Sequence, residues 1–495
     1  MSWLLLIALV YPLLVLAVFA WRKVDPTPSY NRWWIVSAPL PALLAGIALP
    51  DTTLQAPALM FGLVWQLNDF SRPLLLMTTS LYAIASVFGL GYLKPQALRR
   101  YTLFWLLTMF GNLVLLVAQD IASFYTGFAL MTFAGYGLVV HNMSADALRA
   151  GKIYIGMAIM GEVLILAGLI AIMPDMVEPM LHYLPLALSE HSHGIWLTAL
   201  LFAGFGVKAG VLGLHFWLPL AHPVAPTPAS AVLSGAMIKA GLIAWMQILP
   251  LGADHGMFID THLFAWVVIA LGLAASFLAA VFGAIQLKPK AVLAYSSISQ
   301  MGLMTTLLGV ALLMPQLWSG IMVALVAFAV HHGLAKGALF LGVGLATQPA
   351  RLPHWAVLVL LGIPALSLIG LPLTSGGAAK YLLKDEAYQT NLSLLIFLLT
   401  FAAAATTLLM LRFIDLINGQ LRVTLERSQG AAREGDGYIR NAVIAAVLVS
   451  SVAIWWFPLE LSLTSAMTLT GLWETIWPMA LATAIYLTVR RLQPS

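Results

Sequence analysis

The sequence predicts an all-α protein that spans a membrane many times, and three observations support this fold class. Hydrophobic residues make up 61% of the 495 residues and charged residues only 9%, far below the roughly 25% of a soluble domain. Apolar runs of about 20 residues, the length that crosses a bilayer as a helix, recur along the whole chain. Lys and Arg gather in alternate connections between these runs, as the positive-inside rule describes.

We find about fifteen apolar runs long enough to span a membrane. The predicted spans are residues 2–21, 33–50, 70–93, 101–119, 121–141, 152–173, 194–217, 227–249, 262–284, 291–313, 317–346, 354–383, 391–414, 439–457 and 471–489. The first run lacks a basic leader region and a small-residue cleavage site, so we interpret it as a retained helix. A shorter apolar stretch, 55–68, predicts a surface hairpin or an interfacial segment.

The distribution of cations predicts the orientation of the chain. With the N-terminus outside, 18 of the 24 Lys and Arg residues fall in inner loops, two fall outside and four lie within spans. The outer two are Arg72 and Lys384, and the four within spans are Lys208, Lys239, Lys336 and Lys380. We therefore expect an N-terminus outside, a cytoplasmic C-terminus and a location in a bacterial-type cell inner (plasma) membrane.

Two predicted spans, the seventh and the twelfth, contain helix-breaking residues beside a lysine. Glycines flank Lys208 in the seventh span, and prolines and the pair Gly376–Gly377 precede Lys380 in the twelfth. Unwound backbone at membrane depth is tolerated only where it is buried in protein or lines a wet cavity. Paired interrupted helices in two halves of a chain are typical of ion sites between transporter repeats.

This pattern predicts two inverted repeats of five helices with broken helices 7 and 12. The expected division is three N-terminal helices in residues 1–100, a first repeat in 101–250, a second repeat in 251–417, and a cytoplasmic loop with two C-terminal helices in 418–495.

Ionisable side chains inside the spans are the candidate functional residues. Placing a charged side chain in hydrocarbon costs at least about 2.5–3.5 kcal/mol on insertion scales, so such a residue is by default a functional candidate. The predicted proton path comprises Glu162, Lys208, Lys239, His331, His332, Lys336 and Lys380. His332 and Lys336 are four residues apart and share one helix face. The auxiliary candidates near the ends of spans 5 and 7 are Asp120, His215 and His222.

One acid among four lysines favours proton transfer over fixed ion pairing. Glu162 can pair with only one lysine, and burial without a counter-ion disfavours the charged form of the others. Histidines near such lysines can pass protons at neutral pH. Alternatives remain: structural ion pairs for the lysines, a merely packed His331, a structural Glu162, or a fixed ring of lysines that binds an anion. The chain has no cysteine and no phosphate-binding loop, nucleophile motif or metal-ligand cluster, so we expect no cofactor, metal or nucleic-acid partner.

Around these residues the chain resembles a known family, the antiporter-like subunits of respiratory complex I, energy-converting membrane hydrogenases and multisubunit cation/proton antiporters. The matching segments are KAGVLGLHFWLPLAHPVAPTPASAVLSGAMIKAG, KPKAVLAYSSISQMG, HHGLAKGALFLGVG and GLPLTSGGAAK. The AHPVAPTP loop is most similar to the hydrogenase-type branch. The resemblance implies a fourteen-helix core, and it implies that Lys208, Lys239, His332, Lys336 and Lys380 occupy proton-path positions.

The chain departs from the family pattern at several polar positions. The position of the usual glutamate in span 5 is Ala129 here, and Glu162, one span later, is a candidate replacement as the partner of Lys208. Leu220, Gln286 and Gln300 stand where the family usually has an acid, an aspartate and a histidine. These changes indicate a divergent relative with a different partner.

The predicted function is proton translocation by one non-catalytic subunit of a larger membrane complex, a redox-driven translocase of the NADH dehydrogenase or hydrogenase type. Protons would pass Lys239 and Lys336 and leave through Lys380, gated by Glu162 and Lys208. One alternative is a sodium/proton antiporter module, which would need oxygen ligands for Na⁺, whereas Glu162 is the only carboxylate deep within the spans. Another is a membrane partner that couples proton flow to a soluble enzyme, such as one for inorganic carbon uptake.

Overall fold

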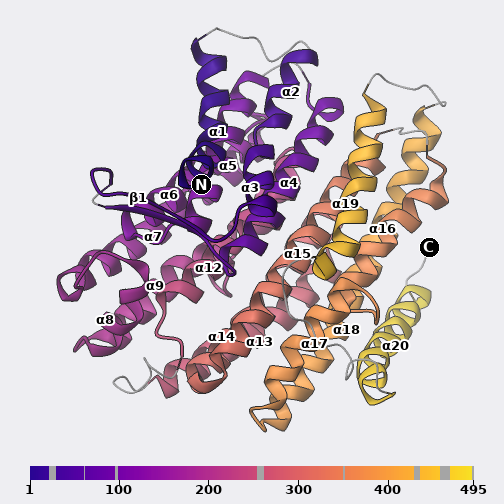
Figure 1. Cartoon of the computed structure of the whole chain (residues 1–495). Coiled ribbons are helices and arrows are strands. Elements are labelled where there is room, and N and C mark those ends of the chain that lie inside the picture. The colour runs from indigo at the N-terminus through magenta and orange to yellow at the C-terminus, as the bar shows by residue number, and fades with distance from the viewer. Residues whose placement is uncertain are drawn as a thin grey trace.

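The protein is a bundle of long helices, seen here in a computed structural model. The structure describes residues 1–21, 29–60, 62–94, 98–252, 261–348, 352–428, 435–456 and 469–492. Figure 1 shows the N-terminal helices on one side of the bundle and the C-terminal helices on the other. Eleven helices in the described part are long and apolar enough to cross a membrane. The all-α polytopic class is confirmed, whereas the count of fifteen spans stays a prediction.

Prolines shape the N-terminal segment after α1 (Ser2–Trp21). The predicted span 33–50 is divided into α2 (Ser29–Ser37) and α3 (Leu40–Ala48), with Pro39 and Pro41 at the start of α3. Proline removes a backbone donor and clashes with the preceding turn, so it is accommodated at a helix start but not in its interior. The stretch predicted as a hairpin forms β1 (Thr52–Ala56) and β2 (Leu63–Leu67), paired antiparallel with Thr52 opposite Leu67.

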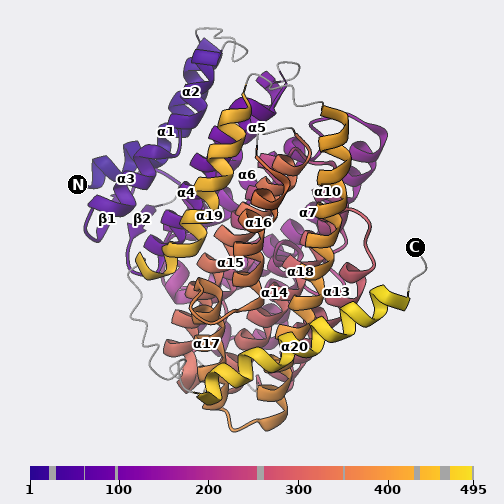
Figure 2. The ribbon, with the colours of Figure 1, turned by 90° about the vertical axis from the view of Figure 1, so that its right-hand side faces the viewer.

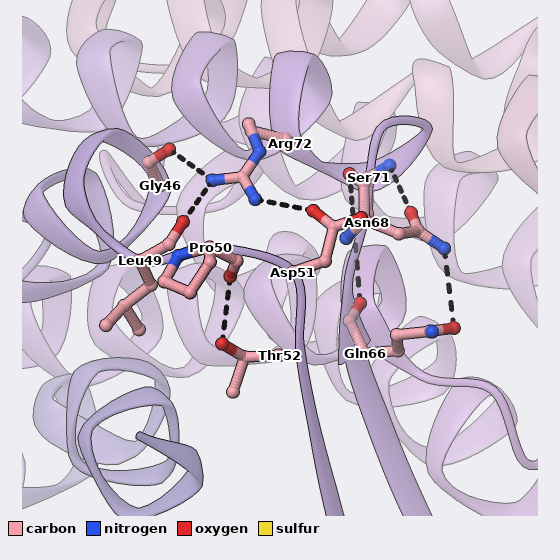
Figure 3. A network of polar contacts seen from close by, with 9 residues as sticks. All are labelled: Gly46, Leu49, Pro50, Asp51, Thr52, Gln66, Asn68, Ser71 and Arg72. Carbon is pink, nitrogen blue, oxygen red and sulfur yellow. Dashed lines mark hydrogen bonds and ion pairs between the residues drawn. The ribbon is translucent and has the colours of Figure 1, made fainter.

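Arg72, in the first turn of α4 (Ser71–Tyr92), joins this hairpin to the helices beside it (Figure 3). Its guanidinium donates to the carbonyl oxygens of Gly46 at 3.0 Å and Leu49 at 2.6 Å, at the end of α3. It also forms an ion pair with Asp51 at 2.8 Å. A cation at a helix C-terminus satisfies unpaired carbonyls and complements the helix dipole. Arg72 is therefore a structural cation at the edge of the bundle.

Most other helices follow the predicted spans. They are α5 (Leu98–Val117), α6 (Ile121–Val139), α7 (Ala145–Ile172), α13 (His262–Ala284), α14 (Pro289–Leu313), α15 (Trp318–Ala346), α18 (Ser393–Ser428), α19 (Asp436–Trp456) and α20 (Leu469–Leu492). The expected cytoplasmic loop from residue 418 is helical as far as Ser428, because α18 runs for 36 residues. Figure 2 shows α20 lying obliquely across α18.

Both spans predicted to be broken are interrupted at a glycine. The predicted seventh span contains α9 (Gly194–Ala209) and the start of α10 (Trp217–Val224), and the twelfth contains α16 (His354–Ile369) and most of α17 (Ser375–Tyr388). Gly210 and Gly370 end the first helix of each pair with φ values of +77° and +98°. Glycine adopts this left-handed conformation without the steric cost of a Cβ atom.

The stretch after the first interruption differs from the expected loop. The stretch between the spans 194–217 and 227–249 is predicted as a connection, yet residues 217–224 form α10 with Pro223 inside it. The eighth span is also irregular: α11 (Thr227–Val232) runs into a π-helix, η3 (Leu233–Met237), before α12 (Lys239–Ile248). A π-helical turn inside an α-helix is uncommon and occurs often at functional sites.

Two pairs of glycines bring neighbouring helices into backbone contact. A Cβ atom on Gly111 of α5 would lie 2.6 Å from the carbonyl oxygen of Gly127 on α6, and one on Gly272 of α13 would lie 2.7 Å from that of Gly302 on α14. Small residues of this kind allow close packing of membrane helices. The first two helices of each predicted repeat therefore meet in the same way.

Candidate functional site

The predicted path residues lie on five helices of the bundle. Lys380, on α17, borders a cavity and is partly exposed to it, whereas the other six are at most 5% exposed. These six are Glu162 on α7, Lys208 on α9, Lys239 on α12, and His331, His332 and Lys336 on α15. In the part of the chain that the structure describes, no ion pair joins a carboxylate to Lys208, Lys239, Lys336 or Lys380.

Lys208 is held by aromatic side chains. Its Nζ donates to the Tyr154 hydroxyl at 3.2 Å, and that hydroxyl donates to the carbonyl oxygen of Thr132 at 2.8 Å. The Nζ also lies 5.4 Å from the centre of the Tyr154 ring and 5.6 Å from that of Trp217. Cation–π contacts of this length contribute about 0.5–2 kcal/mol, more when desolvated. Two rings and one hydroxyl therefore stabilise Lys208 where an ion pair was expected.

Glu162 lies near Lys208 but does not contact it directly. Both side chains line one small cavity of about 20 Å³, together with Tyr154 and Trp217. Both carboxylate oxygens of Glu162 are buried without a hydrogen-bond partner among the described residues. A cavity of this size has room for one water molecule. Any coupling between Glu162 and Lys208 in this arrangement passes through space or through a single water.

The π-helix positions Lys239 and its neighbour Ser234. The Lys239 Nζ reaches back to donate to the carbonyl oxygen of Ser234 at 2.7 Å. The crossing of η3 and α15 is close, because Gly235 and Gly333 face each other and a Cβ atom on either would lie within 2.8 Å of the other's carbonyl oxygen. This crossing brings Lys239 near the polar residues of α14 and α15.

A series of hydrogen bonds connects Lys239 to Lys336. The hydroxyls of Ser234 and Ser297 are 2.8 Å apart, and the Ser297 hydroxyl donates to the carbonyl oxygen of Leu293 at 3.0 Å. The same carbonyl accepts from the Lys336 Nζ at 2.8 Å. All four polar side chains involved are 0% exposed. These contacts place two lysines of different helices on one buried polar network.

The two histidines of α15 have different surroundings. The Nδ1 atom of His331 is 2.9 Å from the Ser375 hydroxyl at the start of α17, and this hydroxyl donates to the carbonyl oxygen of Ser450 at 2.8 Å. His332, by contrast, is fully buried with both ring nitrogens lacking a partner among the described residues. His331 thus connects α15 to the second interrupted helix, and His332 is a buried polar group that its protein neighbours leave unsatisfied.

Lys380 binds at the second helix interruption. Its Nζ donates to the carbonyl oxygen of Ile369, the last residue of α16, at 2.9 Å. The C-terminal end of a helix carries partial negative charge, which favours a cation there. Lys239, Lys336 and Lys380 therefore share one arrangement, an Nζ bonded to a backbone carbonyl oxygen.

The auxiliary candidates are arranged differently. The carboxylate of Asp120 accepts hydrogen bonds from the backbone N–H groups of Ser123 at 2.7 Å and Val64 at 2.9 Å, so it caps α6 and holds β2. His215 accepts from the backbone of Gly213 within the first interruption. His222 is fully buried and stacks on Phe340 of α15, with ring centres 4.6 Å apart. Of the three, His222 lies beside the helix that carries Lys336.

Sequence reasoning missed Tyr154, Trp217, Ser234 and Ser297. Tyr154 and Glu162 are eight residues apart and so lie two turns apart on one face of α7, a spacing that could have linked them. Trp217 is the last residue of the predicted seventh span and begins α10. Serine is common in membrane helices, and no local pattern distinguishes Ser234 or Ser297. Their role in the network depends on a contact between α14 and η3, segments 63 residues apart.

A helical membrane bundle with two interrupted helices and lysines buried along its middle is the architecture of antiporter-like membrane subunits. The sequence matches the family described as "NADH:quinone oxidoreductase/Mrp antiporter, TM" over residues 118–406, more than half of its length, and the chain belongs to this family. The resemblance stated from the motifs is thereby confirmed.

Curated relatives include subunits of two kinds of membrane complex. Hydrogenase-4 component B of Escherichia coli (strain K12) is 28% identical over 341 residues, which cover 63% of this chain and 50% of that protein. Na(+)/H(+) antiporter subunit A1 of Staphylococcus haemolyticus (strain JCSC1435) is 27% identical over 336 residues, 63% of this chain and 41% of that protein. The chain spans about half the length of the curated relatives it matches.

Two solved structures share the fold over nearly the whole chain. A chain of the Mrp complex from Dietzia sp. DQ12-45-1b has a TM-score of 0.76 and 20% identity, covering 98% of this chain and 97% of that chain. A chain of the membrane-bound sulfane sulfur reductase, an archaeal respiratory membrane complex, has a TM-score of 0.74 and 18% identity, covering 96% and 98%. Identity at this level shows the fold.

Proposed function

We propose that this chain moves protons through a membrane as one subunit of a larger complex, along its buried lysines. The observation that carries the proposal is the shared arrangement of Lys239, Lys336 and Lys380, each bonded to a backbone carbonyl. A carboxylate partner would hold a lysine in its charged form. A neutral carbonyl accepts an N–H from an ammonium and from a neutral amine alike, so it holds the side chain in place in both protonation states.

The serine pair supports transfer between the first two of these lysines. A hydroxyl both donates and accepts a hydrogen bond, and the Ser234–Ser297 pair lies between the carbonyls that hold Lys239 and Lys336. The proposed path runs from Lys239 over the serine pair to Lys336, and from there past His332 and His331 to Lys380. Glu162 and Lys208 act in the first repeat, where a change in the charge of one alters the proton affinity of the other.

A sodium/proton exchange function is the second candidate, and one observation favours it. The unpartnered oxygens of Glu162 face a small cavity, and a cation would satisfy both of them. A Na(+)/H(+) antiporter subunit is among the relatives. Sodium-dependent proton uptake that disappears in Glu162→Gln would support this candidate. Coupling of proton flow to a soluble enzyme, such as one for inorganic carbon uptake, stays a prediction. A redox-driven host complex also stays a prediction, and it is supported by the hydrogenase relative.

The arrangement in the membrane is part of the proposal. The cation distribution favours an outer N-terminus, a cytoplasmic C-terminus and a bacterial-type inner membrane. The matching glycine contacts and the two helix interruptions support inverted repeats in residues 101–250 and 251–417, flanked by residues 1–100 and 418–495. In this frame Lys380 faces the outer side and Lys239 receives protons from the inner side.

Proton uptake into liposomes tests the proposal. The complex is purified through a tag on the full chain and reconstituted, a potassium gradient with valinomycin imposes a membrane potential, and a trapped dye reports the internal pH. We expect Lys336→Ala to abolish uptake, because the second lysine of the network is lost. Lys152→Ala, an exposed lysine on α7, is the matched control and should leave uptake unchanged. Normal uptake in Lys336→Ala complexes would contradict the proposed path.

A further inference from the structure

A second and larger cavity lies beside Lys380. It has a volume of about 60 Å³, enough for several water molecules, and is lined by α16, α17, α18, α19 and α20. Lys380 and Lys384, one turn apart on α17, share this wall, and Glu474 of α20 faces it. The cavity therefore holds a path lysine together with a carboxylate from outside the two predicted repeats.

Glu474 is bonded to two residues at the end of α17. One of its oxygens accepts from the Lys384 Nζ at 3.2 Å and from the Tyr388 hydroxyl at 2.6 Å. The side chain of Glu474 is 27% exposed, whereas that of Lys384 is 13% exposed. Glu474 thus contacts both the cavity and the surroundings of the protein.

The position of α20 is fixed at two further places. Trp477 stacks on Phe397 and Phe401 of α18, with ring centres 6.4 Å apart in both cases. Near the other end of α20, Arg490 forms an ion pair with Asp415 of α18 at 2.9 Å. The stacked rings and the second ion pair therefore attach α20 to α18 independently of Glu474, which bonds to α17, and Figure 2 shows α20 lying across α18.

We propose that Glu474 is the outlet carboxylate, which takes the proton from Lys380 and releases it to the water on that side of the membrane. The proposal rests on the proposed proton path. An N–H bond of the Lys380 ammonium breaks and an O–H bond forms on Glu474, through water in the cavity, which leaves a neutral amine and a neutral carboxylic acid. Loss of the proton to outside water restores the carboxylate and its ion pair with Lys384.

Charge favours this order of events. The lysines upstream lack carboxylate partners in the described structure, and Lys239 and Lys336 are 0% exposed, whereas the Glu474 side chain is 27% exposed. While Glu474 is ionised, its negative charge offsets that of Lys384, so Lys380 can be protonated; once Glu474 has taken the proton, the uncompensated charge of Lys384 opposes reprotonation of Lys380. Protonation of Glu474 weakens the pair, and release re-forms it. Lys384 and Tyr388 are positioning residues in this scheme.

The test compares Glu474→Gln with Asp415→Asn in the reconstituted complex. Each variant removes the carboxylate of one ion pair of α20, but only the first changes the cavity. We expect Glu474→Gln to lower potential-driven proton uptake at least tenfold, Glu474→Asp to recover much of it, and Asp415→Asn to stay within twofold of the unchanged protein. Equal effects of Glu474→Gln and Asp415→Asn, including no effect of either, would overturn the proposal.

Two further variants keep the outcomes distinct. If Lys380→Ala loses uptake while Glu474→Gln keeps it, the result contradicts the role of Glu474 and leaves the proton path supported. If Lys380→Ala also keeps uptake, the result contradicts the proton path itself.

Tyr388→Phe is the second variant, for the case that Glu474→Gln does not assemble, because it leaves the carboxylate and its ion pair intact. Loss of that hydroxyl removes a donor that stabilises the carboxylate, so the pH profile of uptake should move to higher pH. An unchanged profile would overturn the proposal.

Discussion

Lys239 and Lys336 donate to the backbone carbonyls of Ser234 and Leu293, and the hydroxyl pair of Ser234 and Ser297 lies between these two carbonyls. The connection joins η3 to α14 and α15, and therefore crosses from the first predicted repeat to the second. It depends on the close contact of Gly235 with Gly333, where no side chain separates the two backbones. Proton exchange between the halves of the molecule is expected at this point.

Removing the Ser297 hydroxyl should slow proton uptake without destabilising the complex severely. Ser297→Ala deletes the link between Ser234 and the Leu293 carbonyl, and loss of a positioned proton donor or acceptor typically costs about 10²–10⁴-fold in rate. Ser297→Thr keeps the hydroxyl and should retain part of the activity. The measurement is dye-reported uptake in liposomes.

Ser299→Ala is the matched control for this prediction. Ser299 is also buried on α14, but its hydroxyl donates to the carbonyl oxygen of Ser276 on α13, away from the lysines. Ser297→Ala loses two buried hydrogen bonds and Ser299→Ala loses one, each worth about 1 kcal/mol. If both variants reduce uptake equally, general destabilisation explains the loss and the serine pair has no transfer role.

Tyr154→Phe should alter the behaviour of Lys208 while keeping the aromatic contact. The variant loses the hydrogen bonds to Lys208 and to the Thr132 carbonyl, but the ring can still lie against the ammonium group. The remaining stabilisation of the charged lysine is weaker, so the pH profile of proton uptake should move to lower pH. A profile identical to that of the unchanged protein would show that the hydroxyl does not influence Lys208.

Arg72→Gln should lower stability and leave proton uptake unchanged. The substitution removes the ion pair with Asp51 and the charged donor to the end of α3, and hydrogen bonds to charged groups are worth about 1.5–3 kcal/mol each. The thermal midpoint of the purified complex should fall by several degrees. Lost uptake in a fully assembled Arg72→Gln complex would assign the N-terminal hairpin a role in transport.

Reporter fusions test the orientation. A reporter fused after Arg491 should be active in the cytoplasm, and one inserted after Glu190, between α8 and α9, should be active outside, because inner loops carry most of the cations. Both reporters on the same side would exclude the proposed number of crossings between these points.

The sequence predicted most of the fold because the signals for membrane helices are local. Apolar runs and glycines beside lysines located α13 within the predicted bounds and both interruptions. The division of α2 from α3 follows from Pro39 and Pro41. These prolines are a local signal for a helix boundary, but the apolar stretch 33–50 was predicted as one span because of its hydrophobic residues. The π-helix of η3 has no such signal, since its shape depends on packing against α15.

The candidate site was predicted less completely, and the reason is long-range contact. The position of each lysine within an apolar run predicted that the lysine is buried. It did not predict which group the lysine would bond to. The expected ion pair of Lys208 with Glu162 is replaced by Tyr154 and Trp217, which come from different helices. Glu474 lies in a span that carried no interruption and no lysine, so only the packing of α20 revealed it beside Lys380.

Lys239→Arg tests the central claim most directly, because arginine keeps the positive charge but cannot release its proton at accessible pH. The measurement is potential-driven proton uptake by liposomes that contain the complex, with assembly checked by size-exclusion chromatography and Lys239→Met as the variant without charge. If Lys239 carries protons, both variants assemble and both lose uptake. Near-normal uptake with arginine, together with loss in the methionine variant, would show that Lys239 is a fixed charge and contradict the account.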